Sequence, residues 1–139
     1  MVILQKASQQ QGAARLGRAA ECLVASWLLL RHDVWVSIMP DASSVDMLVT
    51  RRAMPERILR LQVKATYDRG GRKLVNLSKT SGLKYTAEEV DFIVAVDVEA
   101  RIFWVLPVAL TSKFTRLTLG ERFSGYAYDW HDRHAVIGG

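Results

Sequence analysis

Two polar side chains of complementary chemistry stand close together in the most regular segment of the sequence. From Ile58 to Thr66 apolar and polar residues alternate, which predicts a strand with one buried face and one polar face. Gln62 and Lys64 are two residues apart there, so both side chains project from the same face toward a shared site. Gln62 offers an oxygen that can bind a cation, and Lys64 offers a positive charge.

Two carboxylates are candidates to join this pair. Asp46 interrupts the apolar run from Val45 to Val49, where a solvated charge is not expected, and Glu21 lies in a segment with helical spacing. Asp46 and Lys64 could instead form an ordinary cross-strand ion pair, with Glu21 as a solvated helix residue. Gln62 could also belong to the wet face of an edge strand. The placement of Asp46 favours the functional interpretation.

The elements that must position these residues can be read from periodicity and turn signals. Apolar residues at spacings of three and four predict a helix over residues 12–31, with Leu16, Ala19, Ala20, Leu23, Val24, Trp27 and Leu28 on its buried stripe. Strands are predicted over 34–39, 45–50 and 58–66, and the segment 51–57, which contains Pro55, is expected to connect the last two. Trp27, Trp35 and Trp104 are expected in the core.

The second half of the chain continues this pattern. Gly70 and Gly71 mark a turn within 68–72, and residues 73–79 could be the returning strand. The apolar run 92–98 predicts a strand covered on both faces, with 101–106 as its hairpin partner or neighbour. Pro107 fits the first position of a short helix that ends near Ser112. The segment 115–139 is expected to be irregular or to carry one amphipathic turn around Tyr128 to His134. Residues 1–11 are expected to be flexible.

Length, charge and cysteine content narrow the class of protein. A chain of 139 residues is expected to form a single domain over 1–139, and its half-hydrophobic composition suits a globular core. A net charge of +5 favours an anionic partner, with nucleic acid first. The single cysteine, Cys22, excludes an internal disulfide. We find no transmembrane or signal segment, so an intracellular, cytoplasmic protein without a membrane partner is expected.

Basic residues gather around the strand that carries Gln62 and Lys64. Gly70 and Gly71 would let the turn lie close against a nucleic-acid backbone, although a solvated hairpin tip is nearly as good an explanation. The residues predicted to bind nucleic acid are Arg51, Arg52, Arg60, Arg69, Arg72, Lys73 and Lys79.

The order of these segments resembles a known superfamily. The segments are GRAAECLVASWLL (17–29), SSVDMLVT (43–50), ILRLQVKAT (58–66) and YTAEEVDFIVAVDVEARIFWVLP (85–107). They are similar to the PD-(D/E)XK nucleases, and most to the group I intron homing endonuclease and Holliday junction resolvase-like branch. The resemblance implies an α/β (α+β) fold with a restriction-endonuclease-like core, in which helices flank a central mixed β-sheet.

The resemblance also implies roles for the candidate residues. Asp46 would be the main ligand of Mg²⁺ or Mn²⁺, Glu21 would reach in from the helix, and Gln62 and the carbonyl of Val63 would complete the metal shell. Lys64 would orient the attacking water or stabilise the transition state. Gln62 departs from the commoner acidic residue, which gives the variant pattern E…D…QxK and removes about one unit of negative charge from the site.

The expected function is a metal-dependent DNA endonuclease that acts on duplex or branched DNA. The neutral Gln62 keeps open a catalytically weak or inactive nucleic-acid-binding module of the same fold. A structural protein with an acidic protein partner is the third interpretation. One site cuts one strand, so a homodimer or higher homo-oligomer is expected to match the two-fold symmetry of duplex DNA.

Overall fold

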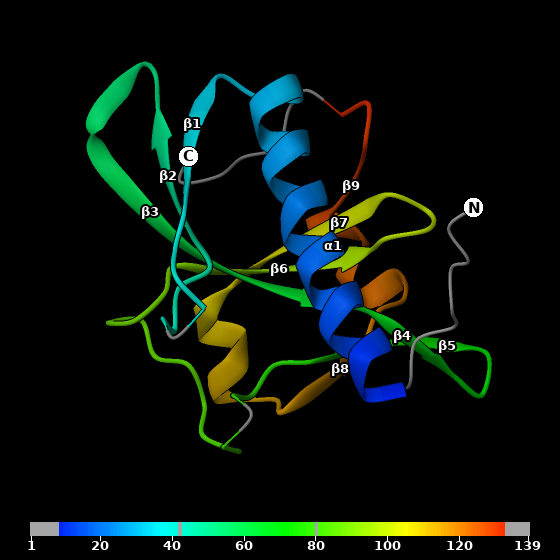
Figure 1. Cartoon of the computed structure of the whole chain (residues 1–139). Helices are drawn as coiled ribbons and strands as arrows, with labels where there is room; N and C mark the ends of the chain where they lie inside the picture. Colours follow the sequence, from blue (N-terminus) through cyan, green and yellow to red (C-terminus); the bar gives the residue numbers. More distant parts are fainter. Residues whose placement is uncertain (1–8, 42, 80, 133–139) are drawn as a thin grey trace, which may run out of the picture.

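The computed structural model describes residues 9–41, 43–79 and 81–132, and the remaining residues lie outside the description that follows. One long helix lies across a large sheet, and a smaller sheet lies near the N-terminal end of that helix (Figure 1). The elements in chain order are α1 (Gln9–Arg31), β1 (Val34–Ile38), β2 (Met47–Arg51), β3 (Met54–Ala65), β4 (Tyr67–Arg69), β5 (Arg72–Asn76), β6 (Phe92–Asp97), β7 (Ile102–Pro107), the 3-10 helix η1 (Val108–Ser112), β8 (Arg116–Thr118), the 3-10 helix η2 (Glu121–Tyr126) and β9 (Ala127–Asp129).

Helix α1 confirms the predicted helix and buries the C-terminal part of the predicted stripe. Ala20, Val24, Trp27 and Leu28 are buried, and the Trp27 ring stacks on Phe103 of β7 with their centroids 4.2 Å apart. Leu16, which is 42% exposed, and Ala19 are both exposed, contrary to prediction, although they continue the same spacing. Periodicity identifies a face of a helix, but it does not show where the opposing sheet ends.

The large sheet has six strands in the order β1-β2-β3-β6-β7-β9. Strands β1, β2 and β3 form the predicted antiparallel meander, β3 and β6 run parallel, and β6 and β7 form the predicted hairpin. The sheet is therefore mixed, as the fold prediction required. A parallel pair needs a long crossover, and β4, β5 and the loop 77–91 provide it between β3 and β6.

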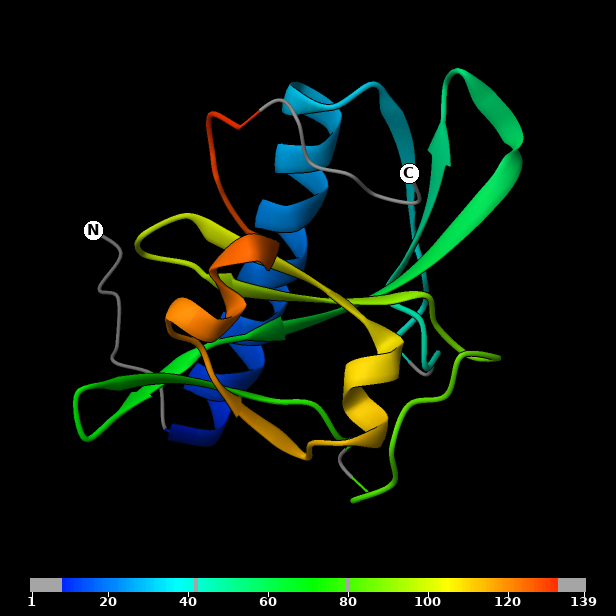
Figure 2. The same cartoon turned by 180° about the vertical axis from the view of Figure 1, so that it is seen from behind.

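The two faces of the sheet are covered by different elements, as the front and back views show (Figures 1 and 2). One core lies under α1 and includes Met47, Val49, Leu61 and Phe103. The other lies under the crossover and the C-terminal elements, and includes Val75, Leu77, Ile93, Leu106 and Phe123. Strands β6 and β7 contribute to both cores, which accounts for their continuous apolar sequence.

Strand β3 begins earlier than predicted. The connection expected over 51–57 is reduced to a tight turn, and β3 already starts at Met54. Pro55 is tolerated because the register shifts between Thr50 and Arg51, so that Pro55 stands at an exposed irregularity where a missing N–H costs little. Trp35, expected in the core, is 69% exposed because the face of β1 that carries it is turned away from α1.

The C-terminal segment differs from the irregular extension expected from sequence. Residues from Arg116 onward form β8, η2 and β9, and β9 is an edge strand of the large sheet. Pro107 caps η1, a 3-10 helix, and does not occupy its first turn.

Of the segment 1–11 expected to be flexible, residues 9–11 belong to α1 and the rest lies outside the described residues. In the described part of the chain, no helix combines the length and apolarity required to cross a membrane.

Candidate functional site

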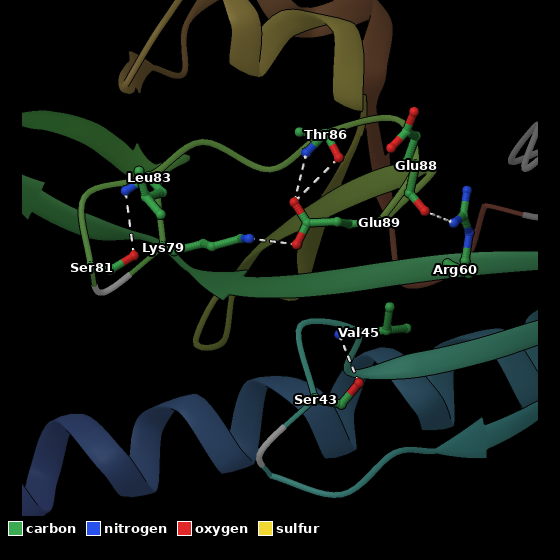
Figure 3. A network of polar contacts seen from close by, with 9 residues as sticks. All are labelled: Ser43, Val45, Arg60, Lys79, Ser81, Leu83, Thr86, Glu88 and Glu89. Carbon is green, nitrogen blue, oxygen red and sulfur yellow. Dashed lines mark hydrogen bonds and ion pairs between the residues drawn. The ribbon is translucent and has the colours of Figure 1, made fainter.

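Asp46 lies immediately before β2 and is fixed to β3 by two hydrogen bonds. Its backbone N–H donates to the carbonyl of Leu61 at 2.9 Å, and its side-chain Oδ2 accepts the N–H of Val63 at 2.7 Å. The turn before it is closed by the Ser43 hydroxyl, which accepts the N–H of Val45 at 3.1 Å (Figure 3). The carboxylate is therefore held against the strand that carries Gln62 and Lys64.

Glu21 reaches the same place from α1. Its carboxylate lies 3.1 Å from a guanidinium nitrogen of Arg18, one turn earlier on the helix, and its side chain is 20% exposed. Arg18 also forms an ion pair with Asp41 in the turn that leads to β2. This arginine thus links the helix to the turn at the edge of the candidate site.

The carboxyl group of Asp46 lies in a buried environment beside a second acidic side chain, Glu21. Burial, together with a hydrogen bond to Glu21 and its charge, raises the pKa of Asp46 to about 7, although the Val63 N–H and Lys64 act in the opposite direction. Carboxylates placed this close resist simultaneous ionisation. A cation between them would remove this penalty, so the pair has the electrostatic character of a cation-binding site.

Gln62 presents a buried oxygen that lacks a hydrogen-bond partner among the described residues. Buried polar atoms are nearly always satisfied, so this carbonyl oxygen is available to bind an ion, a ligand or a water. Gln62 and Asp46 line two adjoining hollows of about 390 and 750 Å³. Arg15, Arg18 and Glu21 line the larger hollow, and Lys64, Lys79 and Tyr85 line the smaller.

Lys64 faces the smaller hollow and is held from two sides. Its Nζ donates to the carbonyl of Ser78 at 3.2 Å and lies 5.3 Å from the centroid of the Tyr85 ring. Burial lowers the pKa of Lys64, while the charge of Asp46 acts in the opposite direction. The ammonium group is therefore positioned by the loop 77–91 as well as by β3.

This loop also brings Lys79 and Tyr85 to the site. Lys79 pairs with Glu89, which also accepts hydrogen bonds from the N–H and hydroxyl of Thr86 at 3.3 and 3.2 Å (Figure 3). The Lys79 ammonium lies 5.6 Å from the Tyr85 ring centroid. No feature of the sequence indicated that Tyr85 or Ser78 belongs to the site, because no spacing rule connects a loop to a strand that it meets only in the fold.

The donors gathered here suit a hard divalent cation. Asp46, Glu21 and the orphaned oxygen of Gln62 are oxygen donors of the kind that Mg²⁺ and Mn²⁺ bind. Val63 lines the larger hollow, so its backbone is close to these groups. Across residues 9–41, 43–79 and 81–132, however, no group of three or more His, Cys, Asp or Glu side chains could hold a metal. Any ion would depend on the amide of Gln62 and on backbone or water oxygens.

The basic residues predicted to bind nucleic acid have different surroundings in the structure. Arg51 ends β2, and Arg52 lies 3.8 Å from Asp33. The side chain of Arg60 is engaged by Asp91 and the carbonyl of Ala87. It also donates to the carbonyl of Glu88 (Figure 3). Lys73 pairs with Asp68 and Asp97, whereas Arg69 and Arg72 line a separate hollow on the β4–β5 hairpin.

Comparison with known proteins identifies the fold. No protein-family model matches the chain, and no curated protein matches it. Among solved structures, the chain is similar to a bacterial homing endonuclease, I-Ssp6803I, with a TM-score of 0.63, 23% sequence identity and coverage of 91% of each chain. The likeness spans nearly the whole of both chains, so the mixed sheet and its flanking helix form the fold of that nuclease.

Proposed function

We propose that this protein is a metal-dependent DNA endonuclease of the PD-(D/E)XK type. The observation that carries the proposal is the meeting of Asp46 and Glu21 beside the orphaned oxygen of Gln62, with Lys64 on the same strand face. The fold supports it, because the similar solved structure is a homing endonuclease. Fold alone does not define function, so the proposal depends on this set of side chains.

Each side chain has a distinct part in the proposed reaction. A bound Mg²⁺ or Mn²⁺ would supply Lewis-acid activation of water and neutralise charge on the phosphate. Asp46, Glu21 and Gln62 would hold the ion, and the backbone of Val63 fixes the orientation of Asp46. Lys64, held by the Ser78 carbonyl, would orient the water or stabilise the negative charge that develops on the phosphate oxygens.

A second candidate is a nucleic-acid-binding module with little or no catalysis. It is favoured by the neutral Gln62, since no third acidic side chain joins the pair among the described residues. A weakly charged ligand set lowers metal affinity, so any catalysis by such a module would need high metal concentrations. The third interpretation, an acidic protein partner, gains no specific support from the geometry.

Cleavage assays separate these candidates. The purified protein is incubated with supercoiled plasmid and with a synthetic branched DNA, in Mg²⁺, in Mn²⁺ and in EDTA. We expect nicking or linearisation that requires metal and is lost in Asp46→Asn, whose side chain keeps the shape of Asp46. DNA binding without cleavage at any metal concentration would favour the binding module.

We propose further that the protein acts inside the cell on DNA as a homodimer or higher homo-oligomer. A single site hydrolyses one strand, and a two-fold pair of sites matches the antiparallel strands of a duplex. Light scattering of the free and the DNA-bound protein tests the assembly. A monomer in both states would contradict it without affecting the proposed chemistry.

A further inference from the structure

The positively charged side chains on the two faces of the β4–β5 hairpin have different surroundings. Asp68 and Lys73 are opposite each other in the register, and their charged atoms lie 2.9 Å apart. Lys73 also lies 2.7 Å from Asp97 of β6, and the two carboxylates raise the pKa of Lys73. The positive charge of Lys73 is thus countered within the protein.

The other face carries a like-charge pair. Arg69 and Arg72 are opposite each other in the same ladder, directly at the turn. Like charges in this arrangement destabilise a sheet unless something neutralises them. Both side chains are exposed, and within the described part of the chain neither makes an ion pair or a side-chain hydrogen bond.

Strand β8, which is distant in the sequence, places a third arginine on the same face. Strand β8 pairs with β5 so that Arg116 is opposite Asn76 and Thr118 is opposite Leu74. Alternation along β5 places Arg72, Leu74 and Asn76 on one face, so Arg116 and Thr118 lie on the face of the two hairpin arginines. Arg116 is also exposed and makes no ion pair or side-chain hydrogen bond with another described residue.

These residues surround one hollow. It has a volume of about 420 Å³ and is lined by Arg69, Gly70, Arg72, Leu74, Arg116 and Thr118. Gly70 and Gly71 have φ values of 58° and 75°, so the turn needs two left-handed residues, which glycine adopts without strain. Three guanidinium groups around a concave surface, with no acidic residue in the lining, suit the oxygens of a phosphate.

We propose that Arg69, Arg72 and Arg116 form a phosphate-binding surface for the backbone of duplex DNA, distinct from the candidate active site. This rests on the proposed function, because it assigns a second contact of the same substrate. The β4–β5 hairpin and most of the described part of the loop between β5 and β6 lie in the lower half of the molecule in both views (Figures 1 and 2). A duplex that reaches the candidate active site would pass the same end of the protein.

The surface differs in two residues from the basic set predicted from the sequence for the hairpin, which is Arg69, Arg72 and Lys73. Lys73 leaves the set because Asp68 and Asp97 bind it, and Arg116 enters because β8 pairs with β5. This gives an internal control, since Lys73→Ala removes the same unit of charge from the same hairpin as Arg72→Ala. Only the arginine substitution removes a proposed phosphate contact.

The test is the salt dependence of DNA binding in EDTA, where metal-dependent cleavage cannot contribute. Fluorescence anisotropy with a labelled duplex compares the full-length wild type with Arg69→Ala, Arg72→Ala, Arg116→Ala, the triple variant and Lys73→Ala. We expect the slope of log K against log salt to fall by about 0.9 for each arginine removed, and by roughly 2 to 3 in the triple variant. Lys73→Ala should leave the slope near that of the wild type.

Several outcomes decide between the alternatives. Equal losses in Lys73→Ala and Arg116→Ala would show that only net charge matters and would overturn the surface. Thermal unfolding of each variant establishes that it is folded, and if the triple variant is not, the three single variants carry the test. If inorganic phosphate at matched ionic strength stabilises the wild type but not Arg116→Ala, while DNA affinity is unchanged, the hollow binds free phosphate and the DNA assignment fails.

Cleavage by the wild type in Mg²⁺ keeps this test apart from that of the proposed enzyme. Loss of the slope in the arginine variants, with no cleavage under any condition, would overturn the endonuclease and retain the surface. Metal-dependent cleavage with an unchanged slope in the triple variant would retain the enzyme and overturn the surface.

Discussion

Asp46 and Asp91 occupy similar positions and have opposite environments. Each lies just before a strand, and each accepts a backbone N–H from β3: Asp46 from Val63 at 2.7 Å, and Asp91 from Arg60 at 2.8 Å. Around Asp91 the Arg60 guanidinium completes the site, with its nitrogen 3.2 Å from the carboxylate. Around Asp46 the side chain that hydrogen-bonds to the carboxyl group is another carboxyl group, that of Glu21.

The electrostatic consequences differ in sign. Burial acts on both aspartates to raise their pKa values, but the hydrogen bonds and charge of Arg60 outweigh it and lower the pKa of Asp91. At Asp46 the burial and Glu21 prevail, and the pKa rises to about 7. At Asp91 the same backbone contact therefore serves a self-sufficient ion pair. At Asp46 it serves an incomplete pair of carboxyl groups, which a metal ion would complete under the proposed function.

The largest expected effect is the loss of cleavage when the incomplete site is altered. Asp46→Ala and Lys64→Ala should each reduce metal-dependent DNA cleavage by at least ~100-fold while leaving the fold intact, because each removes transition-state stabilisation. The initial rate of plasmid nicking in Mg²⁺ measures the change. Asp91→Ala is the matched control and should cleave at a rate near that of the wild type when assayed well below its melting temperature. Undiminished cleavage by Asp46→Ala would contradict the assigned site.

The next effect concerns stability at the self-sufficient site. Asp91→Ala should lower the free energy of unfolding by about 1–2 kcal/mol, because the N–H of Arg60 and its guanidinium lose a charged acceptor. Denaturant titration at neutral pH in EDTA measures it. An unchanged midpoint would show that Asp91 does not stabilise the fold.

A smaller effect is expected when the missing charge is restored. Gln62→Glu supplies a third carboxylate beside Asp46 and Glu21 and should tighten Mg²⁺ binding by about tenfold, since ligand charge sets affinity for hard cations. Cleavage should be retained. Calorimetric titration with Mg²⁺ provides the measurement, and an affinity equal to that of the wild type would remove Gln62 from the ligand set.

The last effect is a change in the pH dependence of stability in the metal-free protein. Because its pKa is raised in the folded state, Asp46 contributes stability that is fully present below the ordinary carboxyl pKa and is lost as the pH rises through about 7. Asp46→Asn cannot ionise and should therefore gain stability relative to the wild type by up to about 1.4 kcal/mol per pH unit between pH 5 and about 7, and no further above it. The difference between the two melting temperatures in EDTA isolates this group from His32, whose pKa is lowered by burial. A constant difference would contradict the assigned environment.

The sequence predicted those parts of the fold that depend on local periodicity. The helix, the β1–β2–β3 meander apart from the early start of β3, the Gly70–Gly71 turn and the β6–β7 hairpin were predicted close to their observed bounds. Strands β8 and β9 were not, because each has three residues and is defined by its pairing partner more than by its own pattern.

In the candidate site, too, only the residues whose placement depends on local geometry could be predicted from the sequence alone. Gln62 and Lys64 could be placed on one face because a strand fixes the direction of its side chains. The roles of Asp46 and Glu21 followed from the family resemblance, and their assignment stays a prediction. The pairing of Lys73 with Asp97, which removes its charge from the predicted binding loop, joins two strands far apart in the chain and has no local signal.

The position of β3 between an antiparallel and a parallel neighbour has a consequence for the order in which the chain folds. Its pairing with β2 closes a short hairpin, which can form in about 1–10 μs, and it brings Asp46 onto the strand of Gln62 and Lys64. Its pairing with β6 must wait until the crossover through β4 and β5 has been closed, at a higher cost in chain entropy. Three of the four candidate site residues are thus expected to meet early in folding, and the parallel pair that joins the two halves of the sheet to form later.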